Sequence, residues 1–206
     1  MAFQSIWYFS DLPKDVVGII ERDLSKDFDG EMEDSRLMGN GINKEKRNSK
    51  NAWIPTDHWV GGFLWSYVER ANRENFLYDL KCIDGESMQY TQYREGQFYG
   101  WHNDSGLSGH YKPQSVGRND ERLANDFINE NTELIRKLSF VLQLSDPDDY
   151  EGGNLQILDE SGGSYIAPRK RGTIILFDSR SMHRVQKVRK GLRKSIVGWV
   201  VGPRWK

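Results

Sequence analysis

The pattern of the chain changes near residue 87, where helical spacing gives way to short runs of strand-forming residues between Gly, Pro and Asp turns. These runs stand at 88–93, 138–144, 154–158, 173–177 and 195–201. β-Branched and aromatic residues bounded by turn residues favour strands, and several short strands in succession favour an antiparallel arrangement. The pattern therefore predicts a mainly β fold with flanking helices: a double-sheet barrel of the jelly-roll kind.

Two amphipathic helices are expected before this change of pattern. Asp11 and Pro13 offer a capping residue and an early proline to the first helix, whose apolar stripe runs over 16–24. The second helix should start near 55–57 and carries apolar residues at helical spacing over 59–71. The two helices should pack on the outside of the barrel.

We expect one domain over 1–206, because this length suits a single hydrophobic core. A helical support region at 1–85, with a polar loop at 40–50, should precede a jelly-roll core at 86–206. A long polar segment, 105–136, interrupts the core. Loops longer than about fifteen residues are uncommon in compact domains unless they act as lids or are disordered. Apolar anchors within the segment favour a substrate lid.

Composition bears on the compartment. Cys82 is the only cysteine, so no intrachain disulfide can form, which agrees with a reducing environment. The chain has no run of about eighteen apolar residues, and its start lacks the basic and then apolar plan of a signal peptide. These observations predict a cytoplasmic protein without a membrane partner.

The net charge of -1 hides a basic segment at 161–206, which holds twelve Lys and Arg against the single acidic residue Asp178. A nucleic-acid surface, a cluster around an anionic cosubstrate and a solvated strand edge would each produce this bias. The last two interpretations are favoured over the first.

The stretch Tyr93-Arg-Glu-Gly-Gln-Phe-Tyr-Gly-Trp-His102-Asn-Asp104 carries the strongest chemical signal. His102 and Asp104 are two residues apart, so on a strand their side chains leave from the same face and can reach one ion. His183 follows a predicted strand and a turn, which would deliver it from a second strand. Two imidazoles and one carboxylate form the facial ligand set of non-haem iron(II) oxygenases, which leaves positions open for a cosubstrate and dioxygen.

Arg193 lies ten residues after His183, where a guanidinium can clamp a carboxylate through two parallel hydrogen bonds. Strand alternation places Arg193 and Ser195 on one face and turns Lys194 to the other, where solvent should surround it. His58, in the first turn of a helix, and His110, in a polar loop, compete with His183 for the metal. Neither is followed by such an arginine.

These residues resemble the iron(II)- and 2-oxoglutarate-dependent dioxygenases, within the prolyl 4-hydroxylase-like branch and its small bacterial and viral members. The resemblance covers about residues 87–201. It rests on Tyr93-x-x-Gly96-Gln97-x-Tyr99-x-x-His102-x-Asp104, Leu138-Ser139, Tyr150-Glu-Gly-Gly153, His183, Arg193 and Trp199, and more weakly on Arg47-x-Ser49 to Trp53-Ile54.

The resemblance implies a jelly-roll oxygenase in which His102, Asp104 and His183 hold iron(II). Its cosubstrates would be 2-oxoglutarate and dioxygen, with stimulation by ascorbate. The implied reaction oxidises 2-oxoglutarate to succinate and carbon dioxide and hydroxylates an unactivated C–H bond. A prolyl residue of a peptide or protein is the expected substrate, while free amino acids and other side chains stay open.

The resemblance also implies roles around the cosubstrate. Arg193, on a face shared with Ser195, would pair with the far carboxylate of 2-oxoglutarate. Ser139 aligns with a hydroxyl that helps to hold the same carboxylate, Tyr93 with a tyrosine that lines the pocket, and Trp199 with a pocket wall. For Ser139, Tyr93 and Trp199, ordinary core or strand packing is the alternative.

Two rival functions fit parts of this pattern. An oxidative nucleic-acid demethylase of the same superfamily would suit the basic segment, but that branch carries a second arginine six residues after the clamp, where this chain has Trp199. A non-catalytic metal-binding jelly roll that acts as a sensor or interaction module would need no cosubstrate clamp, and Arg193 at its spacing argues against it.

Overall fold

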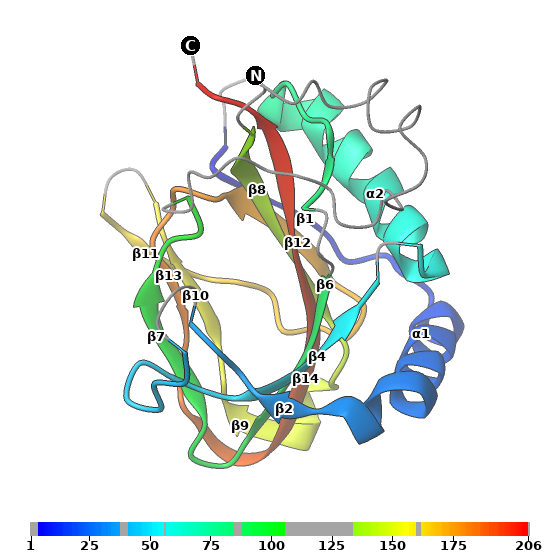
Figure 1. Ribbon diagram of the computed structural model, residues 1–206, viewed down its shortest axis with the longest axis vertical. Helices are drawn as coiled ribbons and strands as arrows, with labels where there is room; N and C mark the ends of the chain where they lie inside the picture. The colour runs from blue at the N-terminus through cyan, green and yellow to red at the C-terminus, as the bar shows by residue number, and fades with distance from the viewer. Residues whose placement is uncertain are drawn as a thin grey trace.

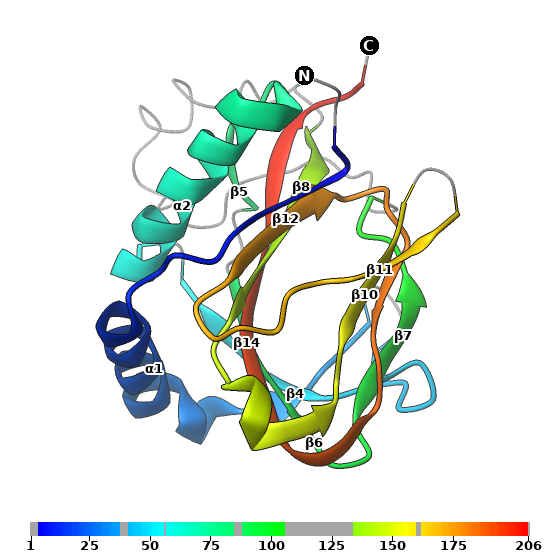
Figure 2. The same cartoon turned by 180° about the vertical axis from the view of Figure 1, so that it is seen from behind.

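The computed structural model describes residues 4–37, 41–55, 57–84, 88–105, 134–159 and 162–205. Within these residues, two β-sheets face each other, and two α-helices lie on the outer side of the larger sheet (Figure 1). The view from behind shows the same layers, with the smaller sheet on the side away from the helices (Figure 2). The expected jelly-roll architecture with flanking helices is confirmed.

The larger sheet contains nine strands of the described chain, in the order β1-β12-β8-β14-β6-β4-β2, and β5 and β9 pair with β14 outside this path. Its strands are β1 (Ile6–Phe9), β2 (Glu33–Asp34), β4 (Lys50–Ile54), β5 (Cys82–Ile83), β6 (Met88–Arg94), β8 (Leu134–Gln143), β9 (Tyr150–Gly152), β12 (Ile174–Asp178) and β14 (Val188–Pro203). The long strand β14 pairs antiparallel with both β6 and β8, so it sets the register of the whole sheet.

The smaller sheet contains five strands of the described chain, in the order β11-β10-β13-β7-β3. They are β3 (Arg47–Asn48), β7 (Phe98–His102), β10 (Leu155–Leu158), β11 (Ser164–Ile166) and β13 (His183–Val185). Short helical segments follow α1, α2 and β8, namely the 3-10 helices η1 (Asp29–Glu31) and η3 (Pro147–Asp149) and the π-helix η2 (Asn72–Phe76).

The two faces of strand β8 contribute to two different hydrophobic cores. Leu138, Phe140 and Leu142 belong to the core between sheet and helices, whereas Val141 packs against the smaller sheet. Successive side chains on a strand point to opposite faces, so Ser139 also faces the smaller sheet. Because β8 is buried on both faces, it carries apolar residues on both, as the consecutive Phe140, Val141 and Leu142 show.

Helix α1 (Lys14–Phe28) was predicted from its apolar stripe, and its buried residues are Val17, Ile20, Leu24 and Phe28. Ile19 lies off the stripe and is 42% exposed. Asp11 does not cap the helix, because Pro13 occupies the cap position and no side chain accepts a hydrogen bond there.

Helix α2 (Trp59–Ala71) begins two residues later than the expected start at 55–57. His58 lies at its cap position, and its Nδ1 accepts a hydrogen bond from the Val60 amide at 3.3 Å. The His58 ring also packs edge-on against Phe28, with the ring centroids 5.9 Å apart. His58 therefore caps the N-terminus of α2 and does not belong to the metal-ligand cluster of the described residues.

The first 85 residues are more than a helical support, since they also supply β1 to β5. Strand β1 pairs with β12 at the edge of the larger sheet, and β4 pairs with β6 near its other edge. Their partners lie far along the chain, so local sequence patterns do not reveal the pairing. In the described residues, no helix is long and apolar enough to cross a membrane.

Two strands of the core start earlier than the sequence pattern indicated. Strand β14 starts at Val188 instead of 195, because the charged residues after Val188 pair with β9 and β6 despite their polarity. Strand β8 starts at Leu134, so 134–136 of the expected lid belong to the larger sheet. Residues 106–133 of that segment lie outside the described residues, and the lid stays a prediction.

Gly198 on β14 provides a test of this packing. It lies opposite Phe140 of β8, and a Cβ at this position would overlap the Phe140 ring. We expect Gly198→Ala to lower the free energy of unfolding by about 1–3 kcal/mol, as overpacking of a well-filled core does. Urea unfolding followed by circular dichroism measures the change.

Gly62→Ala is the matched control, because Gly62 lies exposed within α2 and a Cβ there meets nothing within 4 Å. Alanine in a helix interior should raise the stability by up to about 1 kcal/mol. If Gly198→Ala were as stable as Gly62→Ala, the Phe140 ring would move aside without a cost in free energy.

Candidate metal centre

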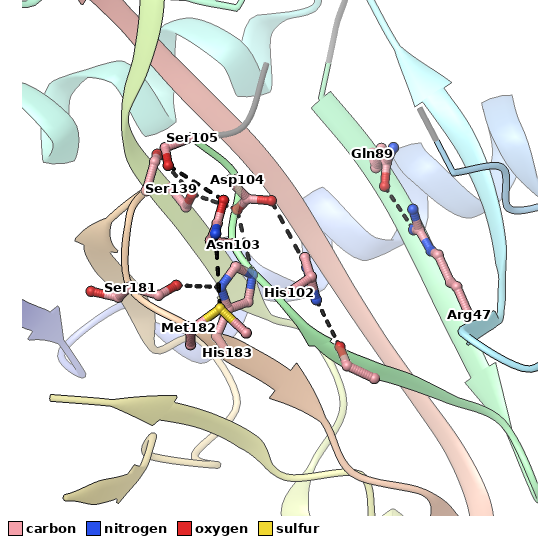
Figure 3. A network of polar contacts seen from close by, with 12 residues as sticks. Arg47, Gln89, His102, Asn103, Asp104, Ser105, Ser139, Ser181, Met182 and His183 are labelled. Atoms are coloured by element: carbon pink, nitrogen blue, oxygen red, sulfur yellow. Dashed lines mark hydrogen bonds and ion pairs between the residues drawn. The ribbon is translucent and has the colours of Figure 1, made fainter. Parts of the chain in front are cut away.

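The three predicted metal ligands lie together at the interior face of the smaller sheet. His102 ends β7, and it pairs across the sheet with His183, the first residue of β13. The Asp104 carboxylate lies between the two rings: Oδ1 is 3.8 Å from Nε2 of His102, and Oδ2 is 3.4 Å from Nε2 of His183 (Figure 3). The donor atoms all lie within 4.8 Å of one another.

A β-bulge in β7 shapes this site. His183 lies opposite His102 and Val185 lies opposite Tyr99, so two steps on β13 span three steps on β7. A bulge of this kind re-aims side chains and is common next to active sites. It brings Tyr99 and His102 onto one face, where their rings stack with the centroids 3.6 Å apart.

Tyr99 belongs to the motif that precedes His102, but sequence reasoning assigned it no role at the site. Residues three apart on a regular strand point to opposite faces, so Tyr99 would have been placed away from His102. The available signal was Gly100 between them, because a glycine inside a strand often marks a bulge or a close backbone approach. Gly100 is close to another backbone, since a Cβ there would lie 3.3 Å from the Lys46 carbonyl oxygen.

Backbone carbonyls orient both imidazoles. Nδ1 of His102 lies 2.8 Å from the Gly100 carbonyl oxygen, and Nδ1 of His183 lies 3.0 Å from that of Ser181. A carbonyl oxygen only accepts, so each Nδ1 carries the proton and each Nε2 is left with a lone pair. Burial and the nearby His183 lower the pKa of His102 well below its ordinary value, which keeps the ring neutral. Neutral, oriented imidazoles are suited to bind a metal.

Asp104 is a buried carboxylate held in its ionised form. Burial raises the pKa of Asp104, but His183, His102 and a hydrogen bond from Ser139 together lower it below the ordinary value. Trp199 acts in the same direction through its indole Nε1, which lies near the carboxylate. Nε1 forms no hydrogen bond with the carboxylate, so it lowers the pKa of Asp104 as a nearby N–H dipole.

Ser139 has a different role from the one expected. Its hydroxyl donates to Oδ2 of Asp104 at 2.6 Å and lies 3.0 Å from the Ser179 hydroxyl. It pairs across the sheet with Trp199, which is six residues along β14 from Arg193. The Ser139 hydroxyl is thus engaged by Asp104 and Ser179, whereas Arg193 is held by Gln143 and Ser195. Ser139 positions Asp104 in this structure, and its expected contact with 2-oxoglutarate stays a prediction.

Arg193 is 1% exposed and lies on the interior face of the larger sheet. Its Nη2 donates to Oε1 of Gln143 at 2.9 Å, and its Nη1 donates to the Ser195 hydroxyl at 3.2 Å. The Tyr93 ring lies 5.6 Å from its Cζ. Ser195 and Tyr93 thus surround Arg193 as expected, while Gln143 was missed because only the pairing of β8 with β14 brings it there.

The Arg193 guanidinium has no anionic partner in the described part of the chain, and its buried Nε has no hydrogen-bond partner at all. A buried charge without a counter-ion is costly, so such a group usually serves a ligand. A cavity of about 340 Å³ is lined by Arg193, Tyr93 and Trp199 together with the three metal-ligand candidates. The donor set and the unpaired guanidinium share one cavity and fit a metal ion and an anionic cosubstrate.

The remaining sequence predictions concern Lys194, the basic segment and His110. Lys194 lies on the face opposite to Arg193, as expected, but it is half-buried and pairs with Glu21 at 3.0 Å instead of being solvated. Arg171 binds the same Glu21, and Arg180 pairs with Asp178. At least three of the twelve basic residues of this segment are therefore paired with carboxylates of the fold. His110 lies outside the described residues.

Comparison with known proteins identifies the family. Residues 88–201, over half of the chain, match the 2OG-Fe(II) oxygenase superfamily. The chain therefore belongs to this superfamily. Membership implies iron(II), 2-oxoglutarate and dioxygen as cofactor and cosubstrates, and the residues present fit them.

Among curated relatives, a PKHD-type hydroxylase of Crocosphaera subtropica is 33% identical over 139 residues, which are 66% of this chain and 53% of that protein. Another, from Rippkaea orientalis, is 32% identical over 65% of this chain and 51% of that protein. The chain spans about half the length of these relatives.

Among solved structures, a Pseudomonas putida prolyl-4-hydroxylase superposes with a TM-score of 0.68 at 20% identity, over 97% of this chain and 93% of that one. A Trichoplax adhaerens prolyl hydroxylase, solved with a hypoxia inducible factor peptide fragment, has a TM-score of 0.67 at 18% identity, over 95% and 83%. Because the sequence identities are only 20% and 18%, the structural likeness establishes the fold alone.

The position of Ser139 leads to a prediction about metal affinity. Partners that orient a metal ligand typically contribute 10–100-fold to affinity, so we expect Ser139→Ala to weaken ferrous ion binding by about that factor. His183→Ala should lose most of the binding, because it removes a ligand. Anaerobic isothermal titration with iron(II) measures both.

His58→Asn is the control, since asparagine also caps a helix and His58 lies outside the site. It should bind iron(II) as the unmodified protein does. If Ser139→Ala weakened 2-oxoglutarate binding and left iron(II) affinity unchanged, the assignment of Ser139 to Asp104 would be wrong.

Proposed function

We propose that this chain is an iron(II)- and 2-oxoglutarate-dependent dioxygenase that hydroxylates a prolyl residue of a peptide or protein. The observation that carries the proposal is that one cavity is lined by the His102, Asp104 and His183 cluster and by the buried, unpaired Arg193. A non-catalytic metal site would have no use for this guanidinium, which disfavours the sensor alternative.

Each residue has a defined task in this proposal. His102, Asp104 and His183 would hold iron(II), with Ser139 fixing the carboxylate and the two backbone carbonyls fixing the rings. When bound, iron(II) supplies the oxidation of 2-oxoglutarate by dioxygen to succinate and carbon dioxide, together with oxygen transfer to the substrate.

Arg193 would bind the far carboxylate of 2-oxoglutarate. Gln143 and Ser195 accept hydrogen bonds from its two terminal nitrogens, so the plane of the guanidinium is fixed before the ligand arrives. A preorganised charged donor in a buried cavity loses little freedom on binding and is not screened by water. The orientation of 2-oxoglutarate toward the metal would follow from this clamp.

The cavity wall supports a prolyl substrate. Trp199 lies under the Arg136 guanidinium, whose Cζ is 4.0 Å from the centre of a Trp199 ring, and Arg136 itself pairs with Asp84 at 2.5 Å. Trp53, 48% exposed, also lines the cavity. Aromatic walls suit a saturated, apolar ring. The PKHD-type hydroxylases and the prolyl-4-hydroxylase named above point to the same substrate class.

The peptide fragment present in the Trichoplax adhaerens structure supports a peptide or protein as the partner. A nucleic-acid substrate is disfavoured, because Trp199 stands where that branch carries a second arginine, and because Arg171, Arg180 and Lys194 pair with carboxylates of the fold. The single domain and the cytoplasmic location stay predictions from the sequence.

The substrate proposal is tested by incubating the purified chain with iron(II), 2-oxoglutarate and a proteome-derived peptide pool in air. Mass spectrometry should detect added oxygen on prolyl residues, together with succinate. Asp104→Ala protein is the control for oxidation by free iron. Added oxygen confined to residues other than proline would reject the prolyl assignment and keep the oxygenase.

For Arg193, we expect the alanine variant to need at least about tenfold more 2-oxoglutarate for half-maximal succinate formation. A charge-assisted hydrogen bond to a carboxylate contributes roughly 1.5–3 kcal/mol, which corresponds to that change or more. Arg193→Lys should be milder, because it keeps the charge. Arg189→Ala, on an exposed residue of the same strand, should leave the concentration dependence unchanged. An unchanged value in Arg193→Ala would remove Arg193 from the cosubstrate site.

A further inference from the structure

A second buried arginine lines the same cavity. Arg47, the first residue of β3, is 6% exposed. Its Nε donates to the Ser49 hydroxyl at 3.1 Å, its Nη2 to Oε1 of Gln89 at 2.9 Å, and its Nη1 to the Arg36 carbonyl oxygen at 3.5 Å. All three acceptors are neutral, so Arg47 has no anionic partner in the described part of the chain.

The other buried charges nearby are accounted for. Asp178 pairs with Arg180, and Asp104 is the carboxylate of the candidate metal-ligand set. Arg193 is the proposed partner of 2-oxoglutarate. Charged side chains are seldom buried without a partner, because removing them from water is costly. Arg47 therefore has a charge that neither the fold nor the cosubstrate explains.

Arg47 is close to the proposed reaction centre. Its Cζ lies 4.7 Å from the centroid of the Tyr99 ring, and that ring stacks on His102 at 3.6 Å. In Figure 3, Arg47 reaches from β3 toward Gln89 on β6. A group of the substrate that touches Arg47 would thus lie near the hydroxylated position.

With the metal ion and 2-oxoglutarate bound, the positive charges of the site can be compared with the negative ones. A divalent metal ion and Arg193 are balanced by Asp104 and the dicarboxylate 2-oxoglutarate. Arg136 is balanced by Asp84. The guanidinium of Arg47 is left over. It has five N–H donors, of which three are used, so one hydrogen on each terminal nitrogen remains for a carboxylate.

We propose that Arg47 binds a carboxylate of the substrate, so that this enzyme prefers acidic substrates. The carboxylate is either an Asp or Glu side chain beside the hydroxylated residue or a free C-terminal carboxylate. This inference rests on the proposed function, because it takes the same cavity as the substrate site. Its rival is a structural role, in which Arg47 only ties the smaller sheet to Gln89 of the larger one.

Two substitutions separate these roles. Arg47→Gln removes the charge. Gln89→Glu keeps Arg47 and its hydrogen bond but places an internal carboxylate where Oε1 of Gln89 now lies, 2.9 Å from Nη2. The second variant neutralises Arg47 and preserves the tie between the sheets. A purely structural role predicts no loss of substrate selectivity in Gln89→Glu.

The measurement is retention of blocked pentapeptide pools by immobilised protein loaded with manganese(II) and 2-oxoglutarate without air. The pools share a randomised central residue and differ only in charge: neutral amidated, Asp-flanked amidated, Lys-flanked amidated, and neutral with a free C-terminal carboxylate. Arg189→Gln controls for net charge, since Arg189 is exposed and outside the cavity. Thermal melting and 2-oxoglutarate affinity report whether each variant is folded and loaded.

We expect one or both carboxylate pools to bind at least tenfold more tightly than the neutral pool, and the Lys-flanked pool to bind least. Which carboxylate pool is retained identifies the source of the anion. Arg47→Gln and Gln89→Glu should each abolish the preference while Arg189→Gln keeps it, and Gln89→Glu should melt no lower than the unmodified protein.

Equal retention of all pools, preference for Lys, no retention of any pool, or a preference that survives in Gln89→Glu overturns the inference. If Arg47→Gln does not fold, Gln89→Glu alone decides. The central residue of the retained peptides tests the proposed function separately. Selective retention of acidic peptides with no enrichment of proline would keep Arg47 as an anion site and reject the prolyl substrate.

Discussion

The buried carboxylate of Asp104 is the group on which the geometry of the site depends. Out of water it must be compensated: the Ser139 hydroxyl donates to Oδ2, and the metal ion that His102 and His183 would also hold would supply the balancing positive charge. The amide of Asp104 donates to the Ser179 carbonyl oxygen at 2.9 Å, which joins the end of β7 to the turn before β13. The backbone of Asp104 thereby ties the segment after β7 to the turn that precedes His183.

The sheet register then determines what each metal-ligand candidate meets. On β14, Trp199 lies opposite Ser139, and six residues earlier Arg193 lies opposite Tyr93. One strand thus carries the support of the metal centre and the anion clamp at opposite ends of a single cavity. The bulge in β7 lets Tyr99 stack on His102. In a regular strand, the Tyr99 side chain would point to the opposite face of the sheet.

Two buried guanidiniums give the cavity its electrostatic character. Arg193 and Arg47 are both held by neutral acceptors, among them the amide oxygens of Gln143 and Gln89. Neutral acceptors orient a guanidinium without neutralising it, so its charge stays available to a ligand. Buried unpaired charge lowers the stability of a fold, and its persistence here is best understood as a cost of binding anions.

The sequence by itself determined the fold class, the apolar faces of α1 and α2, the three metal-ligand candidates and the shared face of Arg193 and Ser195. The helix faces and the shared face of Arg193 and Ser195 follow from local periodicity, whereas the fold class and the metal-ligand candidates also rest on residue types, their spacing and the resemblance to the dioxygenases. Only the tertiary structure decided the partner of Ser139, the stack of Tyr99 on His102 and the contact of Gln143 with Arg193. The reason is that strand register, bulges and burial arise from pairing between segments far apart in the chain, and no local pattern encodes that pairing.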